Sequence, residues 1–371
     1  MNLGIDLSQI VYEGTGIARF TKGLTNAILD FDKKNSWTFF FSSLRKNLDP
    51  EIKNKIEYKG HKLIKWKLPP TFLSFLFNDL HNLLNLTPIP HILTANLDWF
   101  ITSDWSEPPL NIKKAAIVHD LVFLRYPETV APKILQTQKK RLNLIKQESR
   151  IVFTDSNATK YDLADLLKIG SKKIIVNYPG VEVKKPTIEQ INITIKKYHL
   201  NHPFILTVGK QEPRKNIDRL ISAFSKLEDK KLDLVIVGPK GWEAESINYQ
   251  LSNIKYLGLV SDIELFSLYS SCLFFIYPSL WEGFGYPVVE AMNFATPVAT
   301  SNNSSLKEIG HDAAFLFNPL KVDEISHCIK VMKSNIRLRK VLSKKGQERS
   351  KIYIWKTYFN KLIHTLYDHR S

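Results

Sequence analysis

The first half of the chain alternates short apolar runs with segments whose apolar residues recur at helical spacing. An apolar run at Leu3–Leu7 is followed by a turn containing Gly14 and Gly16, and helical periodicity then extends from Ile17 to Leu29. This order predicts a strand, a loop and a helix. The same pattern predicts further strands at residues 115–118, 151–154 and 173–176, and a helix over 161–167.

The second half repeats this alternation after a looser segment. Residues 181–202 are rich in Lys and Glu and contain Pro186, which indicates a connecting region with at most one short helix. Alternating strands and helices favour parallel, doubly wound sheets, and their repetition favours two such α/β domains. Strands are predicted at 204–208, 232–237, 254–257, 273–277, 297–299 and 314–317, with helices near 216–228, 262–271 and 287–294.

The last part of the chain, from about residue 324 to 369, is predicted to form two or three helices. Its final segment contains Trp355, Tyr358 and Phe359. A face this aromatic is too apolar to be left in water, so we expect the segment to pack against another part of the protein.

Composition indicates a globular protein with an anionic partner. The chain has 371 residues, 44% of them hydrophobic and 24% charged, which excludes disordered, collagen-like and coiled-coil classes. Its net charge is +16, and almost all of it comes from residues 131–200 (14 basic, 6 acidic) and 330–371 (12 basic, 2 acidic). A fold that brought these segments together would make one basic face; otherwise they are two separate solvated surfaces.

Cysteine use and hydropathy predict a cytoplasmic protein. Cys272 and Cys328 have no CxxC spacing, which favours a reducing compartment and excludes a disulfide scaffold. The N-terminus has Asp6 in its first apolar run and shows no secretory signal. The longest charge-poor stretch, residues 80–97, is interrupted by prolines, histidines and asparagines, so it does not resemble a membrane-spanning helix.

Two motifs of the first half lie at predicted strand ends, where ligands bind in open α/β sheets. The turn Gly14-Thr15-Gly16 would let a backbone approach a ligand at a helix N-terminus, although a turn with two glycines is more often only a turn. His119 follows the strand at 115–118, and a lone histidine is usually structural. Both are therefore candidates that need support from other residues.

Two motifs of the second half are more informative. Lys210, Arg214 and Lys215 lie within six residues at a strand-to-helix turn, which suits a diphosphate better than a solvated loop. In WEGFGYPVVEA (281–291), Pro287 fits the first position of a helix, so the amides of residues 284–286 and the helix dipole would face one point. Two glutamates, Glu282 and Glu290, suit a polyhydroxylated or anionic ligand, whereas helix capping needs only one.

These segments resemble the retaining GT-B glycosyltransferases of family four. EGFGYPVVEA (282–291) and TPVATS (296–301) are similar to that family's signature. Residues 4–24, 117–128, 208–224 and 301–319 resemble its glycine loop, histidine segment, diphosphate-binding turn and the continuation of the signature. Lys210 departs from the pattern, because many relatives have Arg or a small residue there. A lysine supplies positive charge but cannot form the two parallel hydrogen bonds that an arginine gives to a phosphate.

The resemblance implies a fold and a set of site residues. The fold would be GT-B, with two Rossmann-like domains facing a central cleft: residues 1–185 with a C-terminal helix 352–371 crossing back to them, and a donor domain at 200–351. Lys215, with Arg214 or Lys210, would hold the diphosphate, Glu290 the ribose, and Glu282 the donor sugar. His119 would touch the sugar near its reacting carbon, and Gly16 would complete the phosphate side. The catalytic residues would be Glu282, His119 and Lys215, and the donor-binding residues Gly16, Lys210, Arg214, Lys215, Gly283, Phe284, Gly285, Tyr286 and Glu290.

The implied activity is transfer of a hexose, with retention, from a nucleotide-diphosphate sugar to a glycan or lipid-linked acceptor in surface polysaccharide synthesis. No metal or other cofactor is expected, and the only Asp-x-Asp, Asp30–Asp32, is interpreted as a solvated turn. The acceptor would be bound around residues 42–110. If the C-terminal helix crosses back, the two basic segments would share a face, which suggests peripheral attachment to an anionic membrane at its inner side.

Three other classes of function remain to be compared with this one. A related GT-B phosphorylase or epimerase would lack the EGFG context of residues 282–285. A basic nucleic-acid-binding protein is suggested by the charge and by Lys139-Lys140-Arg141, but no RNP, KH or helix-turn-helix signature supports it, and no nucleic-acid partner is expected. A GT-B protein that binds sugar nucleotides without turnover is the third, and the presence of Glu282, Glu290 and Lys215 argues against it. The donor base and sugar are not predicted.

Overall fold

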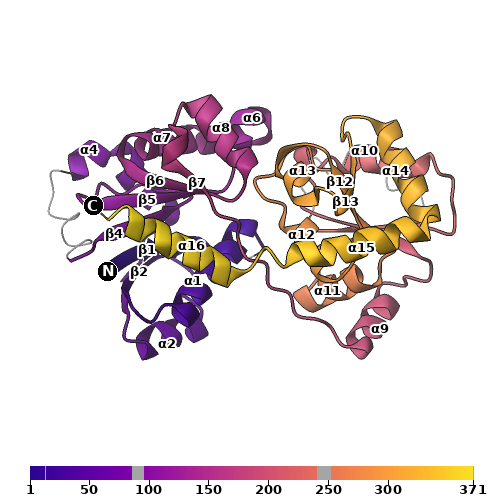
Figure 1. Ribbon diagram of the computed structural model, residues 1–371, viewed down its shortest axis with the longest axis horizontal. Coiled ribbons are helices and arrows are strands. Elements are labelled where there is room, and N and C mark those ends of the chain that lie inside the picture. Colours follow the sequence, from indigo (N-terminus) through magenta and orange to yellow (C-terminus); the bar gives the residue numbers. More distant parts are fainter. Residues whose placement is uncertain (13, 86–95, 240–251, 371) are drawn as a thin grey trace. The chain divides into compact units, whose positions relative to one another are not determined.

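The computed structural model describes residues 1–371 except 13, 86–95, 240–251 and 371 (Figure 1). The chain divides into two compact units, Met1–Gly180 with Ile354–Ser371, and Val181–Tyr353. Part of the charge-poor segment 80–97 lies outside the described residues. Among the described residues, no helix is both long and apolar enough to span a membrane.

The first unit is built on a seven-stranded sheet in the order β3-β2-β1-β4-β5-β6-β7, and every pairing is parallel. The strand order reverses between β1 and β4, which is where open α/β sheets form ligand crevices. The strands are β1 (Asn2–Asp6), β2 (Ser36–Ser42), β3 (Lys62–Trp66), β4 (Trp99–Ser103), β5 (Lys113–Val118), β6 (Ser149–Thr154) and β7 (Ile174–Val176). The helices are α1 (Gly16–Phe31), α2 (Pro50–Tyr58), α3 (Pro70–Ser74), α4 (His81–Leu84), α6 (Val122–Arg125), α7 (Pro132–Glu148), α8 (Asn157–Leu167) and α16 (Trp355–Asp368).

The second unit is built on a six-stranded parallel sheet in the order β10-β9-β8-β11-β12-β13. Its strands are β8 (Phe204–Val208), β9 (Asp233–Val237), β10 (Ile254–Gly258), β11 (Phe274–Tyr277), β12 (Val298–Ser301) and β13 (Ala314–Phe317). Its helices are α9 (Ile188–Lys197), α10 (Ile217–Ser225), α11 (Asp262–Ser271), α12 (Tyr286–Asn293), α13 (Ser304–Gly310), α14 (Val322–Ser334) and α15 (Ile336–Ser350). The doubly wound α/β class is therefore confirmed.

Two stretches of the chain differ from their predicted organisation. The predicted domain ranges leave residues 186–199 outside both domains, but α9 begins with a capping box at Thr187 and packs against α11 in the second unit. In the first unit, β2, β3, β4, α2 and α7 were not predicted.

The interpretation of Asp30–Asp32 as a solvated turn is wrong for Asp32. Its carboxylate is buried at the end of α1 and accepts hydrogen bonds from the backbone of Lys34, from Asn35 and from Trp37 Nε1 at 2.8 Å. Burial raises the pKa of Asp32, but these hydrogen bonds outweigh it and lower the pKa. Asp32 therefore organises the turn that leads into β2, while Asp30 pairs with Lys55.

The aromatic C-terminal helix α16 packs against the first unit. Along α16, Trp355, Tyr358, Phe359, Leu362 and Leu366 are buried, and the helix lies beside α1 (Figure 1). Trp355 fits against two glycines, because a Cβ atom on Gly23 or Gly180 would clash with it. The absence of side chains at these two positions allows the helix to approach closely.

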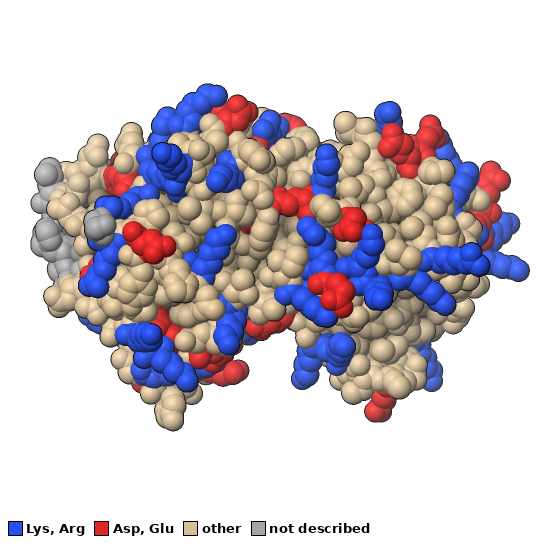
Figure 2. Space-filling model, in the orientation of Figure 1, with Lys and Arg blue, Asp and Glu red and all other residues tan. Residues whose placement is uncertain are grey.

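Each of the two basic segments is divided between the two units, at Gly180 and at Ile354. Of the 12 basic residues in 330–371, only Lys356, Lys361 and Arg370 follow Ile354 and join the first unit. The others are in the second unit, and Figure 2 shows lysine and arginine side chains gathered over α15. Within the first unit, the basic residues of the two segments are therefore these three and those of residues 131–180.

Replacing Gly23 by alanine tests the contact with Trp355. We expect Gly23→Ala to lower the free energy of unfolding by about 1–3 kcal/mol, because overpacking against Trp355 outweighs the roughly 1 kcal/mol that alanine adds to a helix. Gly170→Ala is the control, because its Cβ meets open space. Chemical denaturation measures both, and a Gly23→Ala protein as stable as the control would contradict the packing described.

Candidate functional site

Three loops at the carboxyl ends of β8, β11 and β13 are joined by one asparagine. Asn216 lies at the start of α10 in the left-handed region, with φ of 59°, and is 4% exposed. Its side-chain amide donates to the carbonyls of Pro278 at 3.0 Å and Pro319 at 2.7 Å. The backbone N–H of Leu280 also donates to the carbonyl of Arg214 at 2.8 Å. These bonds hold the Lys-Arg turn after β8 against the loop after β11.

The buried carboxylate of Glu282 lies at the centre of this edge. Its Oε1 is 2.6 Å from Lys215 Nζ and 2.8 Å from Arg214 Nη1. Tyr277 Oη at 2.9 Å and Ser279 Oγ at 2.6 Å donate to the same oxygen. The structure thus brings together three of the predicted site residues, Arg214, Lys215 and Glu282. Tyr277 and Ser279 were not predicted.

Burial and neighbouring charge set the protonation of this cluster. Burial raises the pKa of Glu282, but Arg214 and Lys215 outweigh it and hold the pKa at about 2. Burial, followed by the charge of Arg214, lowers the pKa of Lys215. Burial also raises the pKa of Tyr277 well above its usual value. At neutral pH the cluster therefore contains an ionised glutamate and a neutral phenol.

Lys210 has a different position from the other two cations of its loop. Its ammonium group pairs with Glu212 Oε1 at 3.0 Å, while Arg214 also donates to the carbonyl of Trp281 at 2.8 Å. The charge of Lys210 therefore lies at the exposed side of the loop, whereas Arg214 and Lys215 lie beside Glu282.

The turn between Glu282 and α12 is fixed by a serine in the first turn of α13. Ser305 Oγ lies 2.9 Å from the carbonyl of Glu282 and 2.7 Å from that of Phe284. Gly285 has φ of 107° and caps α12, which begins at Tyr286, so Pro287 is the second helical residue and not the first. The backbone of Gly283–Tyr286 thus leads into the N-terminus of α12, the positive end of its dipole.

Glu290 is buried in the second turn of α12. Its Oε2 accepts a hydrogen bond from Tyr269 Oη at 3.1 Å, and Tyr269 belongs to α11. The two glutamates of the motif therefore have different partners: Glu282 is surrounded by cations and hydroxyl groups, and Glu290 is held by a phenol.

The first unit contains the remaining predicted residues, His119 and Gly16. His119 follows β5 and its Nδ1 lies 2.7 Å from Asp155 Oδ2, at the end of β6. Its ring also contacts Phe20 edge-on, with centroids 4.5 Å apart. Phe20 lies one turn after Gly16 on α1, and Thr15 caps that helix by accepting from the N–H of Ala18. One helix therefore connects the glycine turn to the histidine. Asp155 was not predicted as a site residue.

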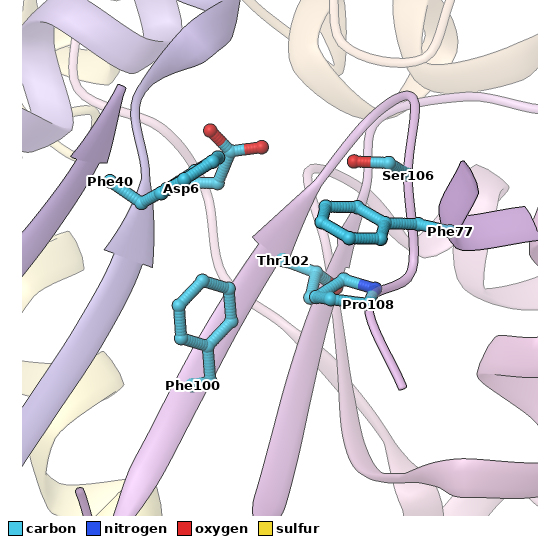
Figure 3. Close-up of a pocket in the computed structure, with 7 residues that line it drawn as sticks. All are labelled: Asp6, Phe40, Phe77, Phe100, Thr102, Ser106 and Pro108. Carbon is cyan, nitrogen blue, oxygen red and sulfur yellow. The ribbon is translucent and has the colours of Figure 1, made fainter. Parts of the chain in front are cut away.

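A small pocket lies at the carboxyl ends of β1, β2 and β4 in the first unit (Figure 3). Asp6 stands at this pocket, and its Oδ1 accepts from the N–H of Ser8 at 2.8 Å. Burial raises the pKa of Asp6 to about 6, so its carboxyl group titrates near neutrality. Most of the lining is apolar; the residues are Asp6, Phe40, Phe77, Phe100, Thr102, Ser106 and Pro108.

Within the described residues, no three His, Cys, Asp or Glu side chains are grouped in a way that could hold a metal ion. Both cysteines are free thiols: the Sγ of Cys272 lies 3.5 Å from the carbonyl of Tyr269, and Cys328 is buried in the core of the second unit.

Comparisons with known proteins relate the chain to glycosyltransferases. Residues 190–349 match the family described as Glycosyl transferases group 1. The chain is 25% identical over 373 residues to O-antigen chain mannosyltransferase B of Escherichia coli, covering 95% of this chain and 96% of that protein.

Solved structures show the same fold. Sucrose-phosphate synthase from Thermosynechococcus elongatus superposes with a TM-score of 0.75 at 18% identity, covering 99% of both chains. HepE from Anabaena, solved in complex with UDP and glucose, superposes with a TM-score of 0.71 at 15% identity, covering 99% of this chain and 100% of that one. With two parallel α/β units and these full-length similarities, the chain has the GT-B fold, and residues 190–349 are similar to the group 1 glycosyltransferases.

Proposed function

We propose that this protein is a retaining hexosyltransferase that moves a sugar from a nucleotide-diphosphate donor to a glycan or lipid-linked acceptor in surface polysaccharide synthesis. The observation that carries the proposal is the buried cluster in which Arg214 and Lys215 meet Glu282 at a sheet edge. Cations in such a site can neutralise a diphosphate, and a carboxylate can accept bonds from sugar hydroxyls. The name of the E. coli relative favours mannose as the sugar.

In the proposed reaction, the bond between the anomeric carbon and the phosphate oxygen breaks, and its electron pair leaves with the nucleoside diphosphate. The acceptor oxygen bonds to the anomeric carbon on the same face, and its proton passes to the leaving phosphate. Lys215 and Arg214 would stabilise the negative charge that develops there, which is the largest protein contribution in such reactions. These cations are the protein's own, so the proposal needs no metal or other cofactor.

The other site residues would hold the donor. Glu290, held by Tyr269, would bind the ribose, and the backbone of Gly283–Tyr286 at the N-terminus of α12 would bind phosphate and sugar oxygens. Lys210 would add charge at the exposed side of the diphosphate. His119 and Gly16, from the first unit, would contact the sugar and the phosphate side.

Glu282 and the diphosphate would compete for the same cations. The ammonium group of Lys215 and the guanidinium of Arg214 already donate to Glu282 Oε1, at 2.6 and 2.8 Å. When a diphosphate takes these donors, the carboxylate is released to accept bonds from the donor sugar. Phosphate binding would thereby prepare the sugar-binding group.

The protein would act in the cytoplasm at the surface of an anionic membrane, where lipid-linked acceptors are found. In the first unit, Phe72 and Phe75 are 43% and 48% exposed and line a groove together with Lys133 and Lys140. Figure 2 shows lysine and arginine side chains over α7, the helix that carries these two lysines. Exposed aromatic rings beside cations fit a membrane interface, where each cation adds roughly 1 kcal/mol.

The function is tested by finding a donor and following the product. A thermal-shift screen of nucleotide sugars identifies the donor, because a ligand present at 100 times its Kd stabilises the folded state by about 2.7 kcal/mol. NMR of the product then gives the configuration at the anomeric carbon, which retention requires to match that of the donor. Failure of every nucleotide sugar to bind would refute the proposal.

Lys215→Ala and Glu282→Ala are each expected to lower kcat/KM by about a hundredfold or more, because each removes a charged group from the proposed donor site. Lys226→Ala is the control, since Lys226 pairs with Asp323 on the surface of the same unit. Transfer assays measure all three, with circular dichroism to check folding. Wild-type turnover in either site variant would remove that residue from the site.

Glu282→Gln is expected to bind inorganic pyrophosphate about tenfold more tightly than the wild type, a change of roughly 1.4 kcal/mol, while losing transfer. The reason is that the competing negative charge beside Lys215 and Arg214 is removed. Asp312→Asn removes an equal charge from the surface and serves as control. Calorimetry measures the Kd, and unchanged or weaker binding would contradict the competition.

The membrane surface is tested by sedimentation with vesicles. We expect binding to vesicles containing phosphatidylglycerol but not to pure phosphatidylcholine, and loss of binding in Phe72→Ser/Phe75→Ser. Tyr58→Ser/Tyr161→Ser is the control, because these aromatic residues are also exposed on the first unit but outside the groove. Equal binding by both double variants, or no binding at low salt, would reject this surface.

A further inference from the structure

His119 is held from two sides in the first unit. Its Nδ1 is 2.7 Å from Asp155 Oδ2, and the ring of Phe20 packs edge-on against it. Thr159 Oγ1 donates to the carbonyl of His119 at 3.1 Å, which ties the end of β5 to the first turn of α8. The histidine is 9% exposed and Asp155 is 3% exposed. The ring therefore has little freedom to turn.

The second ring nitrogen, Nε2, is buried and has no hydrogen-bond partner among the described residues. Buried polar atoms are nearly always paired, so an unpaired one needs a partner such as a water molecule or a ligand. Because Nδ1 is committed to Asp155, Nε2 is the nitrogen through which His119 can act. Because Asp155 accepts from Nδ1, the hydrogen of the neutral imidazole lies on Nδ1. When the ring is protonated, Nε2 carries a hydrogen as well and can donate it.

The charged groups around His119 favour its protonated form. Burial lowers the pKa of the imidazole, but the charge and hydrogen bond of Asp155 outweigh it and raise the pKa. Asp104, after β4, acts in the same direction, and Arg141 of α7 acts against it. Burial, followed by the charge of Asp155, raises the pKa of the Tyr358 phenol on α16 well above its usual value, so this group stays neutral.

We propose that Asp155 is a positioning residue that fixes the orientation and the charge of His119, so that Nε2–H donates to an oxygen atom of the nucleotide-sugar donor. This inference rests on the proposed function. The imidazolium and Asp155 together form a neutral pair, so they can remain buried, and the pair presents one hydrogen-bond donor to an anionic or hydroxyl oxygen. Asp155 itself touches His119 and not the substrate.

The test removes the negative charge of Asp155 and keeps a side chain of the same size and geometry. In Asp155→Asn the amide oxygen can still accept from Nδ1–H, but it carries no charge. We expect the pKa of His119, followed by NMR with ¹³C-labelled histidine and assigned with His119→Gln, to fall by at least one pH unit. Asp162→Asn is the matched control, because Asp162 is also a buried acid of α8 but pairs with Arg125.

The proposal makes protonated His119 the active form, and this determines how activity should depend on pH. Protonated His119 is lost as the pH rises through its pKa, so kcat/KM should decline on the alkaline side in the wild type. The same decline should move to lower pH in Asp155→Asn by the shift seen in NMR, with kcat at least tenfold lower at pH 8. Asp162→Asn should keep the wild-type profile.

Several outcomes would overturn the proposal. A wild-type pKa of His119 at or below the ordinary 6.5 would do so without any variant, even if Asp155→Asn fails to fold. An unchanged pKa in Asp155→Asn, or a changed pKa with an unchanged activity profile, would also overturn it. If the wild type transfers no sugar from any nucleotide donor, the proposed function fails instead, and the NMR titration still decides whether Asp155 controls the charge of His119.

Discussion

The site of the second unit depends on one oxygen atom, Oε1 of Glu282. Two partly buried cations from the loop after β8 and two hydroxyl groups from β11 and its following loop converge on it. Arg214 and Lys215 would repel each other in a buried place without an anion between them, because burial makes unpaired charge expensive. The carboxylate therefore allows two neighbouring positive charges to lie side by side at a sheet edge before a ligand binds.

The supporting contacts explain how such a site can be built on loops. Asn216 and Ser305 bond backbone carbonyls of neighbouring loops, so the turns are tied to each other as well as to the strands. In the first unit, Asp155 and Phe20 do the same for His119. Groups that are fixed before a ligand arrives need little reorganisation during a reaction, which is the main source of electrostatic catalysis.

The sequence predicted most of the second unit, because its strands are mostly apolar and most are bounded by glycine, proline or polar residues. It predicted Arg214, Lys215 and Glu282 as site residues for a related reason: polar residues directly after a buried strand are conspicuous. Tyr277 and Asp155 could not be found in this way, since a tyrosine within an apolar run resembles core and an aspartate before a helix resembles a cap. Their partners are distant in sequence, and only the fold brings them together.

The first unit was predicted less well between residues 36 and 103. There β2 and β3 contain polar residues, and the helix between them, α2, buries only Ile52 and Ile56. Asp32 was misjudged because its burial depends on Trp37, whose position is fixed only when β2 joins the sheet. Charge arithmetic also had a limit, since it counts cations along the chain and cannot show at which residue the chain passes from one unit to the next.

The packing of Trp355 against Gly23 and Gly180 has a consequence for how the protein is made. Residues 1–180 leave the ribosome long before residues 354–371, so the groove on α1 that receives Trp355 stays uncovered during synthesis of the whole second unit. The first unit can complete its own packing only after α16 has been synthesised. The order of synthesis thus separates the folding of its sheet from the closure of this contact, and any chain that stops before α16 leaves the groove open.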